Sequence, residues 1–575
     1  MNARALCGTC SRVTLSTGGA WLGAGDVGNA HAGTTNAALV VGAAVDPAGD
    51  TRCCAPSEVT NNVAQVSCAD NRTVTIGLGV SKGRTLANMD AVQRPVTPHI
   101  VWHVARARSP RSFMARFKSD PMRPLLEDTA QRAIRYLDGL DARSVAPTTT
   151  ALAELSALDG SLPVGPSDPL DVIAELDDLA SPATVAMAGP RFFGFVIGGA
   201  LPVTVAANWL TTAWDQNSAI YRATVATAQI EATALRWLLE VLRLPAESGA
   251  AFVTGATVAN FTALAAARHA VLAKVGWNVE ADGLFGAPPI TVVVGDEIHP
   301  SVTKALGMLG LGRTRVTSVP VDAQGRMRLD RFPTLAGPTI VCVQAGNVNT
   351  GAVDPIADIV ARARDVGAWV HVDGAFGLWA AATPTRAALV QGMELADSWA
   401  TDAHKWLNVP YDSGLAIVRD PHALQAAMAI TAAYLPTEST FRNPSDFTPE
   451  LSRRARGIDV WAALRQLGWS GVAELVEQCC QHATRFATLL QNAGFEILNE
   501  VVLNQVLVSF GDAATTRRVI AAVQDDGTCW AGITEWQGRV AMRISVSSWS
   551  TTAADVDLSV AAIVRVHQIH QQEIS

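Results

Sequence analysis

From about residue 250 onward, short apolar runs alternate with longer helical segments. The apolar runs, rich in Val and Ile, lie at 290–294, 339–343, 368–372 and 415–418. Segments with helical spacing of their apolar residues lie at 257–272, 300–309 and 355–366. Strands that alternate with helices of this length are joined by crossovers and become parallel neighbours. The pattern therefore predicts an α/β domain with a mainly parallel sheet that is buried on both faces.

The pattern changes after about residue 450. Two helical segments, 459–466 and 472–491, precede two short apolar runs at 506–510 and 539–544. Helices that precede strands, rather than alternating with them, are typical of an α+β arrangement. We therefore predict a second, smaller α+β domain at the C-terminal end. A chain of 575 residues is also too long for one compact core.

The first 113 residues differ in composition from the rest of the chain. They are rich in Gly, Ala, Thr, Asn and Val and contain a single lysine, Lys82. A charged amphipathic helix is predicted to begin at Met114. Two interpretations are open: a small domain of unknown role, or a poorly ordered extension ahead of a working start at Met114 or Met122. The abrupt change in composition favours the extension.

Charge and hydropathy exclude several classes of protein. The formal net charge is −8 and the isoelectric point is about 5.8, whereas nucleic-acid or anionic-membrane partners need a basic surface. No run reaches the roughly 18 apolar residues of a membrane-spanning helix. Nine cysteines with one isolated Cys7-Gly8-Thr9-Cys10 motif favour free thiols in a reducing cytoplasm over a metal or redox site. We expect a cytoplasmic protein without a metal, nucleic-acid or membrane partner.

A carboxylate and a lysine follow two apolar segments. His371 and Asp373 end one of the runs, and His404-Lys405 follows a later apolar segment. A lysine amine forms a Schiff base with the aldehyde of pyridoxal 5'-phosphate (PLP). A carboxylate beside the pyridine nitrogen keeps that nitrogen protonated, so that the ring accepts electrons. The structural alternatives are a buried Asp paired with an Arg and an exposed Lys.

Two further segments supply groups that suit the same cofactor. Gly255 joins a strand to an Ala-rich helix, so Ala256 and Thr257 open that helix, where free N–H groups favour a phosphate. His299 follows the run at 290–294, at the strand end where parallel sheets bind ligands, and its imidazole can stack on a flat ring. An ordinary helix cap and a surface-loop histidine are the structural alternatives.

These segments, in this order, resemble the group II PLP-dependent amino acid decarboxylases, which include the aromatic-L-amino-acid, glutamate and cysteine-sulfinate decarboxylases. The resemblance runs from about residue 190 to the C-terminus. The block at 396–410, Ala-Asp-Ser-Trp-Ala-Thr-Asp-Ala-His-Lys-Trp-Leu-Asn-Val-Pro, matches the family's Schiff-base segment almost residue for residue. The resemblance implies the type I (aspartate aminotransferase-like) fold of PLP-dependent transferases, with a mainly parallel mixed sheet in the large domain. It also implies decarboxylation of an L-amino acid to its amine and carbon dioxide.

The resemblance assigns roles by position. It implies that Lys405 forms the Schiff base and that Asp373 pairs with the pyridine nitrogen. It implies that His299 stacks on one face of the cofactor ring and that Ala375 packs on the other. The implied phosphate contacts are Ala256, Thr257 and His404.

Three more positions bear on the reaction. Asn347 is an implied cofactor contact and stands where the family commonly has threonine. Asp402 stands where some members have Asn, and we predict that it does not touch the phosphate, because an acid beside a dianion is unfavourable. Tyr434 matches the loop tyrosine that protonates the substrate carbon after carbon dioxide leaves. The polar stretch 437–449 suits a mobile lid over the site.

The segment after residue 190 is implied to line the substrate pocket. The predicted lining residues are Phe195, Val196, Gly198 and Asn217. Because the sequence departs here from the aromatic members of the family, a polar or acidic amino acid and an aromatic one are both open as substrates. The family also implies a homodimer with shared active sites.

The change in composition and the resemblance together divide the chain into four predicted parts. They are an extension of unknown role (1–113), an N-terminal helical dimerisation segment (114–200), a PLP-binding large domain (201–430), and a mobile loop with a C-terminal small domain (431–575). The alternatives to decarboxylation are another fold type I reaction, by an aminotransferase or a carbon–carbon lyase, and a catalytically silent PLP-binding scaffold. The presence of both Lys405 and Tyr434 favours decarboxylation.

Overall fold

The computed structural model describes residues 55–60, 63–67, 73–77, 122–430 and 441–574. The chain divides into two compact units, Met1–Arg108 and Ser109–Ser575. In the first unit the described residues form three antiparallel strands, β1 (Ala55–Thr60), β2 (Val63–Ser67) and β3 (Thr73–Gly77). The predicted four-part division of the chain, including an extension over 1–113, stays a prediction.

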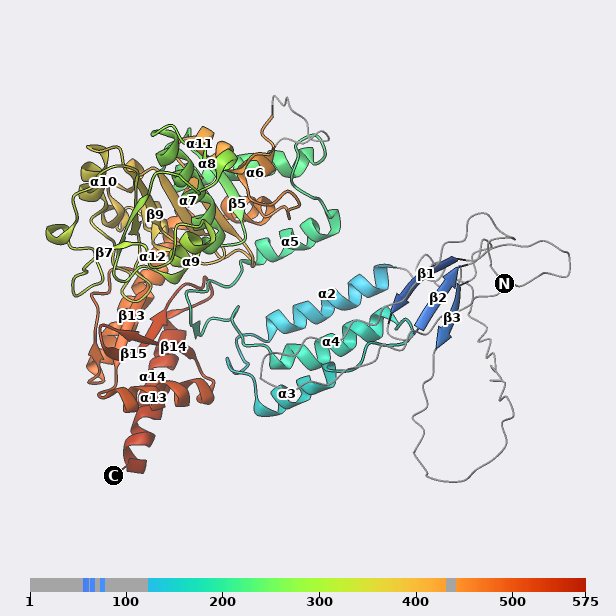
Figure 1. The fold of residues 1–575 in the computed structure, drawn as a ribbon. Coiled ribbons are helices and arrows are strands. Elements are labelled where there is room, and N and C mark those ends of the chain that lie inside the picture. The colour runs from blue at the N-terminus through green and yellow to red at the C-terminus, as the bar shows by residue number, and fades with distance from the viewer. Residues whose placement is uncertain (1–54, 61–62, 68–72, 78–121, 431–440, 575) are drawn as a thin grey trace, which may run out of the picture. The chain divides into compact units, whose positions relative to one another are not determined.

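A seven-stranded sheet lies at the centre of the large domain in the second unit (Figure 1). Its strands in chain order are β5 (Gly249–Val253), β6 (Thr291–Gly295), β7 (Thr317–Val319), β8 (Thr339–Gln344), β9 (Trp369–Asp373), β10 (Ser398–Asp402) and β11 (Gly414–Val418). Their order in space is β5-β11-β10-β9-β8-β6-β7. Only β11 runs antiparallel to its neighbours, so the prediction of a mixed, mainly parallel sheet is confirmed.

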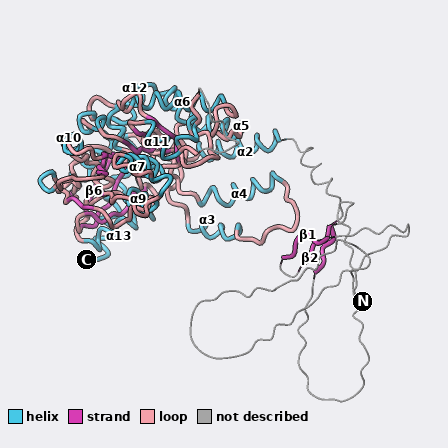
Figure 2. Tube along the Cα trace, turned by 45° about the horizontal axis from the view of Figure 1, so that its top comes forward, coloured by secondary structure: helices cyan, strands magenta, loops and turns pink. Residues whose placement is uncertain are grey.

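Successive residues of the central strands face two separate apolar clusters. Val292 and Val294 belong to the cluster that includes α7 (Ala256–Ala273), whereas Val293 belongs to the cluster that includes α10 (Ile356–Arg364). Because both faces are covered, the strands are apolar at nearly every position rather than at alternate ones. Figure 2 shows helices and loops surrounding the strands of this domain.

The remaining helices surround this sheet or belong to the flanking segments. They are α2 (Met122–Asp138), α3 (Thr149–Glu154), α4 (Pro169–Ala183), α5 (Pro202–Trp214), α6 (Val225–Val241), α8 (Val279–Asp282), α9 (Pro300–Met308), α11 (Pro421–Met428), α12 (Gly457–Asn492), α13 (Ala513–Asp526) and α14 (Ala553–Ile574). The predicted segments 459–466 and 472–491 are the two halves of α12, which bends at Gly468, where φ is 58°. Among the described residues, no helix is long and apolar enough to cross a lipid bilayer.

A second sheet of five strands forms the smaller C-terminal domain (Figure 1). Its order is β12 (Glu496–Ile497), β13 (Gln505–Ser509), β15 (Arg539–Ser545), β14 (Trp530–Trp536) and β4 (Phe192–Phe193). The predicted strands are β13 and β15. The sequence did not predict β4, which reaches this sheet from far upstream and pairs in parallel with β14. The segment that follows β4, including Phe195, therefore lies beside the C-terminal domain.

Candidate active site

The predicted cofactor residues come from strand ends along one edge of the large sheet. Strand β5 ends at Val253 and β10 ends at Asp402, and Gly414 at the start of β11 pairs with both. Strand β9 ends at Asp373, which pairs with Ala400 near the end of β10. The residues that follow β5, β9 and β10 in the chain therefore meet at this edge, where parallel sheets bind ligands.

Asp373 is a buried carboxylate with no ion pair to any described residue. Its Oδ2 accepts hydrogen bonds from Asn260 Nδ2 at 3.1 Å and from Ser301 Oγ at 3.3 Å. Its Oδ1 accepts one from the backbone N–H of Ala375 at 3.2 Å. A buried carboxylate without a cation is costly. A protonated pyridine nitrogen would supply the missing positive charge, so Asp373 fits the cofactor.

His299 is fixed by its place at the start of α9. Its Nδ1 accepts the backbone N–H of Ser301 at 3.2 Å, so His299 is the N-cap of α9. Burial lowers the pKa of His299; the carboxylate of Asp373 opposes this shift and the ammonium of Lys405 adds to it. His299 is therefore a neutral ring that lies within electrostatic range of both Asp373 and Lys405.

The N-terminus of α7 faces His404. The helix begins at Ala256, and a Cβ on the capping Gly255 would lie 3.2 Å from His404 Cε1. His404 Nδ1 accepts the backbone N–H of Ser413 at 3.1 Å, so Nε2 carries the proton of the neutral ring. Burial lowers the pKa of His404. A neutral N–H donor opposite the free N–H groups of Ala256 and Thr257 suits a phosphate group.

Lys405 forms an ion pair with Asp402. The distance from Lys405 Nζ to Asp402 Oδ2 is 2.9 Å, and the side chains are 17% and 3% exposed. The other oxygen, Asp402 Oδ1, has no hydrogen-bond partner among the described residues and lies 3.7 Å from His404 Nε2. The carboxylate thus already has the lysine ammonium as its partner. The prediction that Asp402 does not touch the phosphate stays untested.

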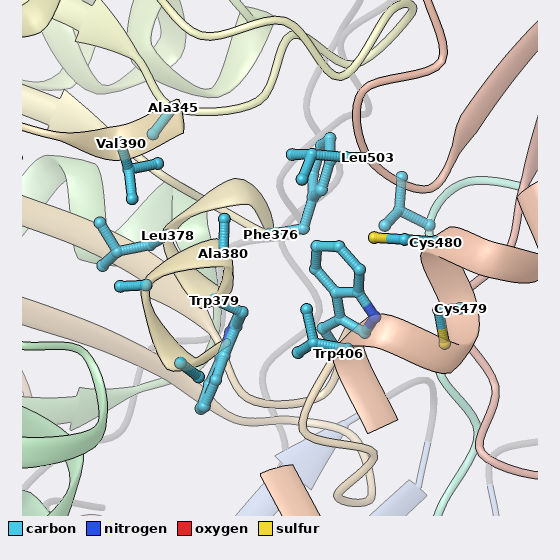
Figure 3. Packing of buried hydrophobic residues seen from close by; sticks show 14 of the residues in the cluster. Ala345, Phe376, Leu378, Trp379, Ala380, Val390, Trp406, Cys479, Cys480 and Leu503 are labelled. Atoms are coloured by element: carbon cyan, nitrogen blue, oxygen red, sulfur yellow. The ribbon is translucent and has the colours of Figure 1, made fainter. Parts of the chain in front are cut away.

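Close packing fixes the backbone around Lys405. The adjacent Trp406 is fully buried, and Figure 3 shows it next to Phe376 and Cys480. Gly198 lies against the lysine itself, because a Cβ at position 198 would be only 1.7 Å from the carbonyl oxygen of Lys405. Gly198 is a predicted pocket residue, and this contact gives it a second reason to be glycine: any side chain there would displace the lysine backbone.

The other predicted pocket residues lie in different surroundings. Phe195 is 59% exposed and stacks on Trp530, with 5.4 Å between the ring centroids. Val196 is buried in the main apolar cluster. The Oδ1 atom of Asn217 accepts the backbone N–H of Arg453 at 2.9 Å. The role of these residues in a substrate pocket stays a prediction.

The side chain of Asn347 bonds within its own loop and to Glu297 in the loop that follows β6. Its Nδ2 donates to Glu297 Oε2 at 3.2 Å, and its Oδ1 accepts the backbone N–H groups of Asn349 at 2.9 Å and Thr350 at 3.3 Å. These bonds organise the turn that follows β8. A direct cofactor contact by Asn347 would have to replace one of them, and that contact stays a prediction.

The sequence did not predict two polar residues near the site. Asn260, on the Ala-rich face of α7, is fully buried and hydrogen-bonded to Asp373. Arg543, on β15, is half-buried, has no carboxylate partner among the described residues, and helps to lower the pKa of His299. A lone Asn among alanines was the available signal for the first, and nothing in the local pattern marks the second. Tyr434 lies outside the described residues.

Comparison with known proteins supports the same assignment. Residues 153–511 match the family model described as the pyridoxal-dependent decarboxylase conserved domain. The aromatic-L-amino-acid decarboxylase of Bacillus atrophaeus is 26% identical over 457 residues, which cover 76% of this chain and 93% of that protein. The aspartate 1-decarboxylase of Aliivibrio fischeri is 30% identical over 267 residues, covering 44% and 48%.

A solved structure shows the same fold. The crystal structure of Oryza sativa TDC with PLP and tryptamine superposes with a TM-score of 0.72 at 22% identity, over 78% of this chain and 98% of that one. The architecture is therefore that of a fold type I PLP enzyme. The chain belongs to the pyridoxal-dependent decarboxylase family, and it is a PLP-dependent amino acid decarboxylase.

Proposed function

We propose that the residues at this edge of the large sheet bind PLP, and that they contact different parts of the cofactor. Ala256, Thr257 and His404 bind the phosphate at the N-terminus of α7. Lys405 binds the cofactor aldehyde through Nζ, and Asp373 accepts the proton of the pyridine nitrogen. The convergence of β5, β9 and β10 at one sheet edge carries this proposal, because it brings these groups together.

The bound cofactor supplies an electron sink for the pair of electrons released when the bond from Cα to the carboxylate breaks. The protein provides the surroundings for that step. His299 offers a neutral ring face, while Ala375 is small enough to leave the other face accessible. Arg543, a half-buried cation without a carboxylate partner among the described residues, is suited to bind the carboxylate of the amino acid substrate.

Tyr434 is the proposed proton donor to the substrate Cα after carbon dioxide leaves. We expect Tyr434→Phe to lower the amine yield and to divert product toward carbonyl compounds, because protonation of the substrate Cα becomes slower. Product analysis by mass spectrometry, alongside carbon dioxide release, measures both. Tyr136→Phe, which removes a hydroxyl that shares a hydrogen bond with Thr184 Oγ1, is the matched control. Unchanged amine production in Tyr434→Phe would remove this residue from the mechanism.

The substrate is an L-amino acid, and its side chain is open between the acidic and aromatic classes. Relatives carry both kinds of name, an aromatic-L-amino-acid decarboxylase and an aspartate 1-decarboxylase. Carbon dioxide release across a panel of aromatic, acidic and polar L-amino acids identifies the class. Keto-acid formation without carbon dioxide would contradict the assignment of a decarboxylase reaction to this site.

We also propose that the active unit is a homodimer in the cytoplasm. Helix α2 has no fully buried residue, and large apolar side chains are exposed on α2, α4 and α5, including Leu126, Ile134, Leu176, Trp209 and Leu210. Exposed apolar surface of this extent marks an interaction face. The partner that we propose for this face is a second copy of this chain, as the family resemblance implies.

Sedimentation equilibrium tests the dimer. We expect a mass of twice 60.4 kDa in the presence of PLP. Trp209→Asp together with Leu210→Asp should shift the mass to one chain and abolish activity, whereas Leu162→Asp, on an exposed loop residue, should do neither. A wild-type protein that is fully active as a monomer would contradict the proposal.

A further inference from the structure

A chain of hydrogen bonds runs through the interior of the large domain to Asp373. Trp369 Nε1 donates to Ser398 Oγ at 2.8 Å, and Ser398 Oγ lies 2.9 Å from His371 Nδ1. His371 Nε2 lies 2.8 Å from Asn260 Oδ1, and Asn260 Nδ2 donates to Asp373 Oδ2 at 3.1 Å. All five side chains are buried: Trp369, Ser398, His371, Asn260 and Asp373 are between 0% and 6% exposed.

The direction of every bond in this chain is fixed from its inner end. An ionised carboxylate only accepts, so the NH₂ group of Asn260 donates to Asp373 and Asn260 Oδ1 faces His371. The imidazole Nε2 therefore carries the proton and donates to Asn260 Oδ1. Nδ1 of the neutral ring is then an acceptor, so Ser398 Oγ donates to it.

The first member of the chain agrees with this direction. An indole N–H only donates, so a donor-only end at Trp369 and an acceptor-only end at Asp373 belong to one polarised chain. Burial lowers the pKa of His371 to about 4, although the nearby carboxylate of Asp373 opposes the shift. The imidazole is therefore neutral at ordinary pH and keeps a single tautomer.

We propose that Ser398 and His371 are positioning residues that, through Asn260, keep Asp373 ionised and oriented as the acceptor for the pyridine nitrogen of PLP. Neither residue contacts the cofactor in this scheme. If the chain lost its direction, the amide of Asn260 could turn and present its oxygen to the carboxylate. Asp373 would then favour its protonated form, and the pyridine nitrogen would lose its proton acceptor. This inference rests on the proposed pairing of Asp373 with that nitrogen.

The test uses the full-length enzyme loaded with PLP that carries ¹⁵N in the pyridine ring. The ¹⁵N chemical shift reports directly whether the nitrogen is protonated, which a merely structural role would not change. Ser398→Ala removes the hydroxyl that donates to His371, and Trp369→Phe removes the donor at the outer end of the chain while leaving Ser398, His371 and Asn260 in place. In both variants we expect the ¹⁵N signal near neutral pH to move toward the unprotonated position, with the larger movement in Ser398→Ala.

Kinetics give a second measurement. We expect kcat to fall about tenfold in Ser398→Ala, the usual scale for losing a hydrogen bond that supports a charged group, with little change in KM. Thr262→Val is the matched control, because Thr262 lies on the same helix as Asn260, is fully buried, and has a hydroxyl with no hydrogen-bond partner among the described residues. The control should leave both the ¹⁵N signal and kcat unchanged.

The outcomes separate this inference from the assignment of Asp373. If the wild-type signal is that of a protonated nitrogen and Asp373→Asn removes it, the pairing stands. Unchanged ¹⁵N signals in folded, PLP-loaded Ser398→Ala and Trp369→Phe would then overturn the positioning role alone. If Ser398→Ala does not fold, Trp369→Phe decides. A wild-type signal that Asp373→Asn leaves unchanged would refute the pairing itself.

Discussion

Replacing Lys405 by Ala is expected to abolish the reaction and the visible absorbance of the bound cofactor together. The lysine is the proposed attachment point for the aldehyde, and no other amine among the described residues pairs with the buried carboxylate of Asp402. Loss of a covalent catalyst lowers kcat by roughly three orders of magnitude or more. Absorbance spectroscopy of the purified protein and carbon dioxide release measure the two effects.

Two further variants test whether the effects of Lys405→Ala are specific to this lysine. Lys304→Ala, at an exposed position on α9, should leave both the spectrum and the rate unchanged. Removing Lys405 also leaves Asp402 as a buried charge without its partner, so the thermal midpoint of Lys405→Ala should fall, and adding Asp402→Asn should restore part of it. Persistence of the visible absorbance in Lys405→Ala would refute the assignment of this lysine.

Asp373→Asn is expected to lower kcat on the order of 100- to 1000-fold while the protein still folds. An amide cannot hold the pyridine nitrogen in its protonated form, so the cofactor becomes a weaker electron sink. The substitution keeps the shape of the side chain but places two amides, those of positions 260 and 373, against each other. The ¹⁵N signal of labelled PLP and the steady-state rate test this expectation.

Asp354→Asn is the matched control for Asp373→Asn. Asp354 is equally buried, accepts the backbone N–H groups of Met327 at 2.8 Å and Gln344 at 2.7 Å, and has a pKa raised by burial to about 6. Its substitution should lower stability by a comparable amount and leave the ¹⁵N signal unchanged. If both variants lose activity in proportion to their loss of stability, Asp373 has a structural role only.

The sequence was most informative where the chemistry depends on residues at strand ends. The alternation of apolar runs and helices predicts β6, β8, β9 and β11 of the large sheet, and Asp373 lies at the end of β9. His404 and Lys405 follow β10, which the sequence marked only as an apolar segment. Because parallel strands place their carboxyl ends along one edge, proximity in space follows from the order of elements. The family resemblance then supplied the cofactor and the reaction.

Other features depend on partners that are remote in sequence. Gly198 and Lys405 meet through their backbones, and β4 joins β14 across most of the chain. The hydrogen-bond chain to Asp373 joins three separate segments, and a histidine inside an apolar strand resembles any other buried residue in the sequence. No local pattern reports such pairings, because each residue's neighbours are set by tertiary contacts.

The insertion of β11 between β5 and β10 affects the order in which the protein can be assembled. Strand β5 and the turn that begins α7 are synthesised more than 140 residues before β11, yet β5 has no other hydrogen-bonded neighbour in the sheet. The pairing of β5 with the rest of the sheet therefore forms only after residue 418 has left the ribosome, although α7 also packs on β9 and β10. Ribosome-bound nascent chains shorter than this should not capture the cofactor, and the late closure of so long a loop makes this step a slow one in folding.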